Sequence, residues 1–295
     1  MGQAIELPPD QQILKAHPKL TFEKNGYTYT IERKGDLSTY TVRDAGGELS
    51  LPIQYAFGLH MQTFVFHYQG RFYESMVSFY PKLSALAITL GDEQLRPRNL
   101  VEAMGRETST QETTVCFGCH ATGAVDQGRL SLDSFQPGVR CEHCHTGADA
   151  HMDAMAAGKT APMPVSLGRM RAEDMSNFCG QCHRTWDSIV RAREWGEVNV
   201  RFAPYRLANS QCFLGDDKRI RCTACHDPHA SLSRDEAAYD RACLACHASK
   251  PQKPCPVSNK DCVTCHMPKV TLSDGHAVFT DHQIRIARPR DPYPN

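Results

Sequence analysis

Polar and apolar residues alternate along the first third of the chain, over residues 20–80. A period of two is typical of β-strands that bury one face. Residues 20–22 and 27–31 flank Asn25-Gly26, a two-residue turn that favours a tight hairpin. Further strands are expected at residues 38–42, 49–53, 63–68 and 71–79. This small antiparallel β meander is expected to hold an aromatic stripe in its core: Tyr27, Tyr29, Phe64, Phe66, Phe72 and Phe79.

Beyond residue 105 the pattern changes to short helices joined by irregular chain. Residues 108–112 supply N-cap side chains for a helix. Further helices are expected at residues 147–157, from 172 to about 190, and at 235–245, with irregular chain at 198–207 and an extended arm at 276–288. The predicted fold class is therefore α+β. Its parts are an N-terminal tail at 1–18, a β-rich domain at 19–105, and a mostly α-helical and irregular domain at 106–295.

Charge and composition exclude some classes of function. The 295 residues carry 33 Lys and Arg against 33 Asp and Glu. Because no basic face is sustained, we expect no nucleic-acid partner. No run of 18 apolar residues occurs, so no membrane span is expected. Residues 1–12 lack the regions of a secretory signal, and we expect a mature chain whose leader has been removed or replaced.

The C-terminal part repeats the pattern Cys-x-x-Cys-His six times. Two thiols on one turn can each form a thioether with a haem vinyl group, and the next residue places an imidazole under the iron. Zinc ribbons, iron–sulfur sites and thioredoxin-like sites also use Cys-x-x-Cys, but none requires the histidine that follows here every time. We therefore predict six covalently bound haem c groups, which makes residues 106–295 a hexahaem cytochrome c domain. The attachment cysteines are Cys116, Cys119, Cys141, Cys144, Cys179, Cys182, Cys222, Cys225, Cys243, Cys246, Cys262 and Cys265, and the proximal iron ligands are His120, His145, His183, His226, His247 and His266.

Six porphyrins would supply much of the apolar core of this domain, so the chain is expected to fold poorly without them. Haem attachment to such motifs takes place outside the cytoplasmic membrane, which predicts a periplasmic or extracellular protein. Disulfides persist there, and two cysteines, Cys212 and Cys255, lie outside the motifs. We prefer a disulfide between them; the alternatives are two separate thiols, or one thiol near a haem edge.

Fourteen histidines minus six proximal ligands leave eight candidates for the sixth iron ligand. Full bis-histidine ligation is therefore possible, and it suits low-potential electron transfer. His229 follows His226 by three residues, too close to reach the opposite face of the same haem, so we expect it on a neighbouring iron or, alternatively, on a propionate. His151 lies on the helix expected after the second motif. His276 and His282 lie on the extended arm, whose position a ligand role would explain.

The other four histidines are open at this stage. His60 and His67 are either iron ligands or ordinary polar strand residues. His143 lies inside a motif and is expected to point outward or to a propionate. His17 is either solvated or a ligand offered to another subunit.

Three motifs carry further residues that resemble a known group. Residues 222–229 read Cys-x-x-Cys-His-x-Pro-His, residues 141–145 are followed by Thr-Gly-Ala-x-Ala-His, and residues 262–266 by Met-Pro. Over about residues 110–285 the chain resembles the multihaem cytochromes c grouped with hydroxylamine oxidoreductase and pentahaem nitrite reductase. The resemblance implies haems stacked in parallel and perpendicular pairs, with distal histidines supplied from a neighbour's segment. The nitrite reductases have a lysine as one proximal ligand, whereas all six motifs here end in histidine, so no catalytic residue is assigned.

Three functions are consistent with this pattern. The preferred one is an electron carrier that relays electrons between a redox protein donor and an acceptor. The second is a subunit of an extracellular cytochrome filament, in which His17, His276 or His282 would ligate a neighbouring subunit's iron. The third is an oxidoreductase acting on a small nitrogen or sulfur compound at one open haem.

Overall fold

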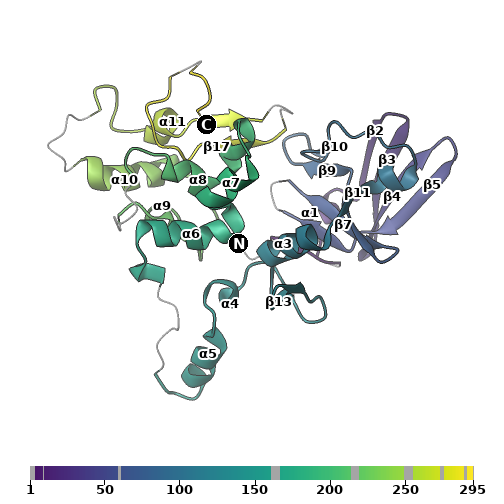
Figure 1. Cartoon of the computed structure of the whole chain (residues 1–295), viewed down its shortest axis with the longest axis horizontal. Coiled ribbons are helices and arrows are strands. Elements are labelled where there is room, and N and C mark those ends of the chain that lie inside the picture. Colours follow the sequence, from purple (N-terminus) through teal and green to yellow (C-terminus); the bar gives the residue numbers. More distant parts are fainter. Residues whose placement is uncertain are drawn as a thin grey trace. The chain divides into compact units, whose positions relative to one another are not determined.

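The computed structural model describes residues 4–8, 10–58, 61–160, 167–213, 219–248, 255–272, 276–288 and 291–294. The chain divides into two compact units, Met1–Pro164 and Val165–Asn295. The first unit contains the main sheets and the second is mainly helical (Figure 1). The predicted α+β fold class, a strand meander followed by a helical and irregular region, is confirmed.

A four-stranded antiparallel meander opens the first unit. Its strands lie side by side in chain order: β2 (Lys19–Lys24), β3 (Tyr27–Lys34), β4 (Leu37–Asp44) and β5 (Gly47–Pro52). The predicted hairpin turn is present, because Lys24 pairs with Tyr27 and both turn residues have positive φ, 54° at Asn25 and 82° at Gly26. Two positive φ values in succession are what a tight hairpin turn requires.

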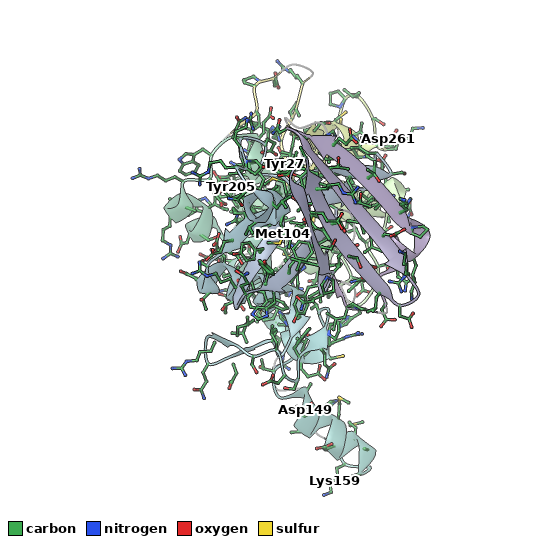
Figure 2. The ribbon with its side chains drawn as sticks, turned by 90° about the vertical axis from the view of Figure 1, so that its right-hand side faces the viewer. Tyr27, Met104, Asp149, Lys159, Tyr205 and Asp261 are labelled. Atoms are coloured by element: carbon green, nitrogen blue, oxygen red, sulfur yellow. The ribbon has the colours of Figure 1, made fainter. Side chains whose placement is uncertain are left out.

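A second antiparallel sheet has the order β1-β6-β7-β8-β11. Its strands are β1 (Ile5–Glu6), β6 (Tyr55–Phe57), β7 (Thr63–Tyr68), β8 (Arg71–Ser75) and β11 (Gly105–Thr108), and a separate hairpin is formed by β9 (Val77–Tyr80) and β10 (Ala85–Ile88). The main core collects side chains from these strands and from α2 (Leu100–Met104). At its centre the buried Tyr40 hydroxyl donates to the carbonyl of Met104, 3.0 Å away (Figure 2). Most of the predicted aromatic stripe is buried here, and Phe72 packs in a smaller neighbouring cluster.

The N-terminal segment differs from the predicted tail at residues 1–18. Ile5 and Glu6 pair with β6, and α1 (Gln12–Ala16) buries Leu14 completely in the main core. Only one large apolar side chain of this helix is fully buried. A single apolar position in a polar stretch forms no periodic pattern from which the sequence could have predicted the helix. The expected tail is therefore part of the first unit.

The first haem motif is joined directly to the sheet. β11 pairs with β8, and the next residue, Ser109, caps α3 (Thr110–His120). The Ser109 side chain accepts from the Glu112 N–H at 3.2 Å, and the Glu112 carboxylate accepts from the Ser109 N–H at 2.8 Å. The compact units consequently divide after residue 164 rather than at residue 105, so the first two motifs belong to the sheet unit.

The rest of the first unit consists of short elements. They are β12 (Ala121–Thr122), β13 (Val125–Asp126), β14 (Arg129–Leu130), β15 (Gln136–Pro137), α4 (Cys141–Cys144) and α5 (Ala148–Ala156). The expected helix at 147–157 is therefore present as α5; Asp149 and Lys159 mark the two ends of this segment in Figure 2.

The second unit contains the other four motifs. Its helices are α6 (Ala172–His183), α7 (Trp186–Ala192), α8 (Ala203–Ala208), α9 (Cys222–Cys225), α10 (Glu236–His247) and α11 (Cys262–His266), with 3₁₀ turns at Leu167–Arg169 and Glu197–Arg201. Two short strands, β16 (Lys269–Thr271) and β17 (Val278–Thr280), form a hairpin pair. Among the described residues no helix combines the length and apolarity needed to span a bilayer.

Two expectations for this unit were wrong. The helix expected from 172 to about 190 breaks at Arg184, which has φ of 63°. The break brings Thr185 so close to α6 that a Cβ on Gly180 would lie 2.7 Å from the Thr185 Cγ2 atom, and only glycine fits there. Residues 198–207, expected to be irregular, form a 3₁₀ turn followed by α8, in whose first turn Pro204 is well tolerated.

Candidate haem-attachment sites

Each of the six Cys-x-x-Cys-His motifs lies on helical backbone. Three motifs end the longer helices α3, α6 and α10, and three form the single turns α4, α9 and α11. Residues three apart lie on the same face of a helix, so the two thiols of each motif point the same way. All twelve motif cysteines are part-buried or exposed. This arrangement fits covalent attachment of a porphyrin through two thioethers.

Acidic caps fix where several of these turns begin. Asp235 accepts from the Ala237 N–H at 3.0 Å and starts α10. Further along α10, Asp240 accepts from the backbone N–H groups of Asp261 and Cys262, at 2.6 and 2.8 Å. Burial alone would raise the pKa of Asp240, but these backbone hydrogen bonds hold it below its ordinary value. The carboxylate on the fifth motif's helix therefore orients the turn that carries the sixth.

In the second unit each of the four motifs lies close in space to the motif that follows it in the sequence. The Cys179 thiol hydrogen-bonds Cys222 and lowers its pKa. The pKa of Cys243 is raised by burial and by the nearby Cys225. Burial, Asp240 and, more weakly, Cys243 raise the pKa of Cys262 to about 11. Helix packing follows the same order, with α9 against α6 and α10 against both α9 and α11.

Two of the predicted proximal histidines are oriented by backbone carbonyls. His120 Nδ1 lies 2.7 Å from the carbonyl of Ala4, and His266 Nδ1 lies 2.9 Å from that of Arg285. A histidine whose Nδ1–H donates to a carbonyl presents an unprotonated Nε2, the form that binds a metal. Burial lowers the pKa of His120, which also favours the neutral ring. The carbonyls on these Nδ1 atoms are independent of the motif pattern, and they too fit a site that binds haem c.

Among the described candidate distal ligands, His282 lies beside a motif histidine. Its ring centre is 6.1 Å from that of His226 in the fourth motif. The His282 Nδ1 atom lies 3.0 Å from the carbonyl of Thr280. Burial and the neighbouring His226 lower the pKa of His282, so the ring is held neutral.

The structure places the other candidates as follows. His229 is largely exposed, with Nδ1 3.3 Å from the Asp227 carboxylate, and His151 and His276 are part-buried. His17 ends α1 with its ring 4.8 Å from that of Phe79, and His67 is exposed on β7, 4.8 Å from the Phe72 ring. His143 lies on α4, where burial lowers its pKa. His60 lies outside the described residues.

The expected disulfide between Cys212 and Cys255 is absent, and this is a correction. Both residues are described, and no disulfide joins them. Cys212 lies within electrostatic range of Cys225 and Cys243, whose pKa values it helps to raise. Cys255 is exposed, and the backbone N–H groups of Ser258 and Val257 lower its pKa. Cys212 is thus grouped electrostatically with cysteines of the fourth and fifth motifs, whereas Cys255 is exposed.

A buried ion pair that the sequence did not reveal holds the C-terminal arm. Arg206 and Asp281 are both fully buried, with Nε–Oδ1 and Nη2–Oδ2 distances of 2.8 and 2.9 Å. Arg206 also donates to Asn199, Gln283 and the carbonyl of Pro294, and its guanidinium lies 4.5 Å from the Tyr293 ring centre. The available signal was weak, because Arg206 is one of two arginines in the mostly apolar segment 198–207, and nothing local points to a partner 75 residues away.

A second polar cluster lies beside the first motif. The Arg106 guanidinium contacts Glu74 at 2.9 Å and Glu112 at 2.8 Å, whereas its nearest approach to Asp92 is 3.9 Å. Asp92 is 5% exposed, and its Oδ2 accepts no hydrogen bond from a described residue. Burial and the Glu74 charge raise the pKa of Asp92 to about 7. Arg106 is already shared by two closer carboxylates, so Asp92 keeps its proton.

This cluster predicts a pH dependence for the first unit. Asp92 binds its proton more tightly in the folded than in the unfolded state, so its contribution to the unfolding free energy is most favourable below about pH 4 and falls as pH rises to about 7, by up to about 1.4 kcal/mol per pH unit. Asp92→Asn should abolish that slope in chemical denaturation at a series of pH values. The matched control is Asp36→Asn, because Asp36 is 82% exposed on a turn of the same unit. A slope that persists unchanged in Asp92→Asn would contradict the assignment.

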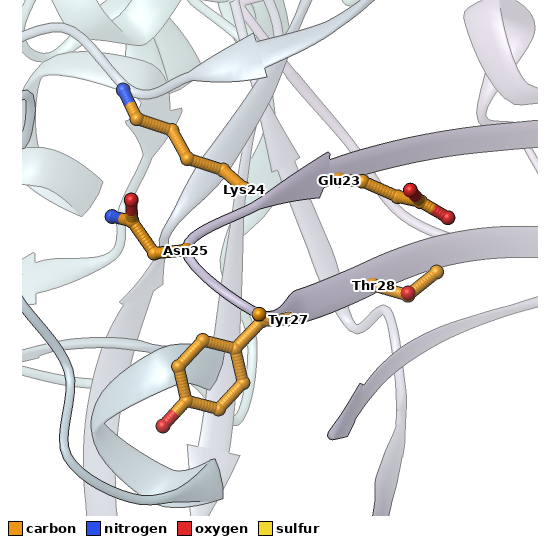
Figure 3. Close-up of a pocket in the computed structure, with 6 residues that line it drawn as sticks. Glu23, Lys24, Asn25, Tyr27 and Thr28 are labelled. Carbon is orange, nitrogen blue, oxygen red and sulfur yellow. The ribbon is translucent and has the colours of Figure 1, made fainter. Parts of the chain in front are cut away.

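Two hollows mark the surface of the first unit. One lies at the β2–β3 turn, lined by Glu23, Lys24, Asn25, Gly26, Tyr27 and Thr28 (Figure 3). It contains no motif residue, and the Tyr27 hydroxyl turns away to donate to Pro97. The other, of about 290 Å³, is lined by Gly118 of the first motif and by Glu142 and His143 of the second, with residues 121–125 between them. The second hollow thus lies where the first two motifs meet.

Comparison with known proteins gives one match. Residues 86–146, which include the first two motifs, match the family described as cytochrome c554 and c-prime. No curated protein and no solved structure matches the chain. The family match does not test the narrower resemblance to the hydroxylamine oxidoreductase group, which stays a prediction. Together with the attachment geometry, it supports a c-type cytochrome that carries covalently bound haem c and transfers electrons.

Proposed function

We propose that the chain is a hexahaem cytochrome c that relays electrons along a series of closely spaced haems between a donor and an acceptor redox protein. The observation that carries this proposal is the packing of consecutive motif helices in the second unit, α6 against α9, α9 against α10 and α10 against α11. Porphyrins attached to adjoining turns would lie close together, and short edge-to-edge separations are what electron relay needs.

Some residues of each site would attach the porphyrin, and others would orient the iron ligand. When bound, haem c supplies the one-electron chemistry, since its iron alternates between two oxidation states. The paired thiols fix each porphyrin covalently, and the motif histidines supply the proximal nitrogen. Carbonyls such as those of Ala4 and Arg285 hold the tautomer that leaves Nε2 available. We further propose that the protein works outside the cytoplasmic membrane, where such haems are attached.

The C-terminal arm bears on the filament alternative. In that alternative His276 or His282 would leave its own chain to ligate a neighbouring subunit's iron. The arm is instead bonded to its own unit: the Asp281 N–H donates to Pro268 at 2.9 Å, and the Arg285 N–H to His266 at 3.1 Å. These contacts favour a ligand role for His282 within its own chain.

Haem stoichiometry tests the proposed function. Intact mass of the purified protein is expected to show six haem additions, and the double variant Cys243→Ala/Cys246→Ala is expected to show five, because both thioethers of one motif are lost. Cys212→Ala, which changes a cysteine outside the motifs, should retain six. Fewer than six additions in the unaltered protein would contradict a hexahaem cytochrome.

A further inference from the structure

We infer that His282 and His226 are the two axial ligands of one iron, that of the haem attached to the fourth motif. The inference rests on the proposed function, because it requires a haem at Cys222 and Cys225. It assigns a particular distal histidine to a particular motif, 56 residues earlier in the chain.

The separation of the two rings fits a shared metal. Two imidazoles on opposite sides of one metal ion, each bonded at about 2 Å, have ring centres about 6 Å apart. The observed distance between the ring centres is 6.1 Å.

The tautomer of His282 suits a ligand role. Its Nδ1 lies 3.0 Å from the carbonyl of Thr280, so this nitrogen donates and carries the proton. The lone pair is then on Nε2, as in the proximal histidines His120 and His266, whose Nδ1 atoms also face carbonyls. A backbone carbonyl on Nδ1 is the usual partner of a metal-bound histidine.

The backbone on both sides of His282 is fixed. Before it, Asp281 is held by the buried Arg206. At the residue itself, the Ser210 hydroxyl donates to the His282 carbonyl at 3.2 Å and accepts from the Ile284 N–H at 2.8 Å. A metal ligand must be held in place by its surroundings, and here Asp281, His282 and Ile284 are each bonded to α8 or to the turn after it.

The competing histidines are less well placed. His229 belongs to the same motif as His226, and its side chain is 78% exposed. The distance between the His282 and His226 rings assigns His282 to the fourth motif, and the experiment below separates this assignment from one to the third.

The spin state of the haem-loaded protein tests the inference. In His282→Gly, about one haem in six is expected to become high-spin in the oxidised absorption and electron paramagnetic resonance spectra, because its iron loses a strong-field nitrogen. Added imidazole should return it to low-spin. Ile286→Gly places the same substitution at an exposed position of the same arm and should leave the spectra unchanged. His282→Met, which retains an axial ligand, should raise the midpoint potential of one haem.

Haem counting by intact mass separates the possible failures. Six haems with wholly low-spin spectra in His282→Gly would overturn the ligand assignment and leave the proposed function intact. Fewer than six in the unaltered protein would contradict the proposed function itself. The pairing is tested by adding His282→Gly to Cys222→Ala/Cys225→Ala, which lacks the fourth haem: no further high-spin iron is expected. A new high-spin iron in that background would show that His282 binds the haem of another motif and would overturn the pairing.

Discussion

Replacing Arg206 by leucine is expected to lower the unfolding free energy of the second unit by about 3–5 kcal/mol. The cost arises because the fully buried Asp281 would lose its bidentate cation and keep the single contact from the Arg285 guanidinium, which cannot satisfy both carboxylate oxygens. Burial alone would raise the pKa of Asp281, and the hydrogen bonds from Arg206 are the largest of the effects that hold it below its ordinary value. Chemical denaturation of the haem-loaded protein measures the change.

Two further variants isolate the cause. Arg171→Leu removes an arginine whose ion pair with Asp174 is about half exposed, and should cost less than about 1 kcal/mol. Arg206→Met combined with Asp281→Leu should recover part of the loss, since no buried charge is left unpaired. If Arg206→Leu were as mild as Arg171→Leu, the buried pair would not be what holds the arm.

Replacing Phe117 by alanine is expected to destabilise the first unit by about 3–5 kcal/mol. Phe117 stands between the two cysteines of the first motif and is fully buried. Its ring makes edge-on contacts with Tyr55, Phe57 and Phe135, at centroid distances of 4.9, 5.2 and 5.9 Å. Truncation would leave a cavity that cannot collapse between a sheet and a helix, and thermal or chemical unfolding would report it.

The same position in another motif supplies the control. Thr223 also follows the first cysteine of its motif, but it is exposed on α9. Thr223→Ala is expected to change the unfolding free energy by less than about 0.5 kcal/mol. Equal effects at Phe117 and Thr223 would mean that the first motif is not anchored in the sheet unit as the structure indicates.

Local features of this protein were determined by the sequence alone. Asn25-Gly26 forms the predicted hairpin because few other dipeptides adopt two positive φ values in succession. The helix of the first motif begins at Ser109 because the serine and Glu112 satisfy each other's backbone N–H groups. The six motifs lie on helical turns, as thiols three residues apart require. In each case the interacting groups are within about four residues of one another, so the pattern and its cause are in the same stretch of chain.

Contacts between distant residues were decided only by the tertiary structure. Leu14 in the core, the Arg206–Asp281 pair and the approach of His282 to His226 join segments that share no periodic signal. The sequence reduced the distal ligands to eight histidines and favoured four of them, but it could not pair a histidine with a particular haem, because that depends on which carbonyl meets Nδ1 and which ring faces Nε2. The same reason explains the error at Cys212: two cysteines left over from the motifs suggest a disulfide, whereas the structure has no bond between them. The composition gives the number of histidines and cysteines that could form pairs. Which of them come into contact is determined only by the path of the folded chain.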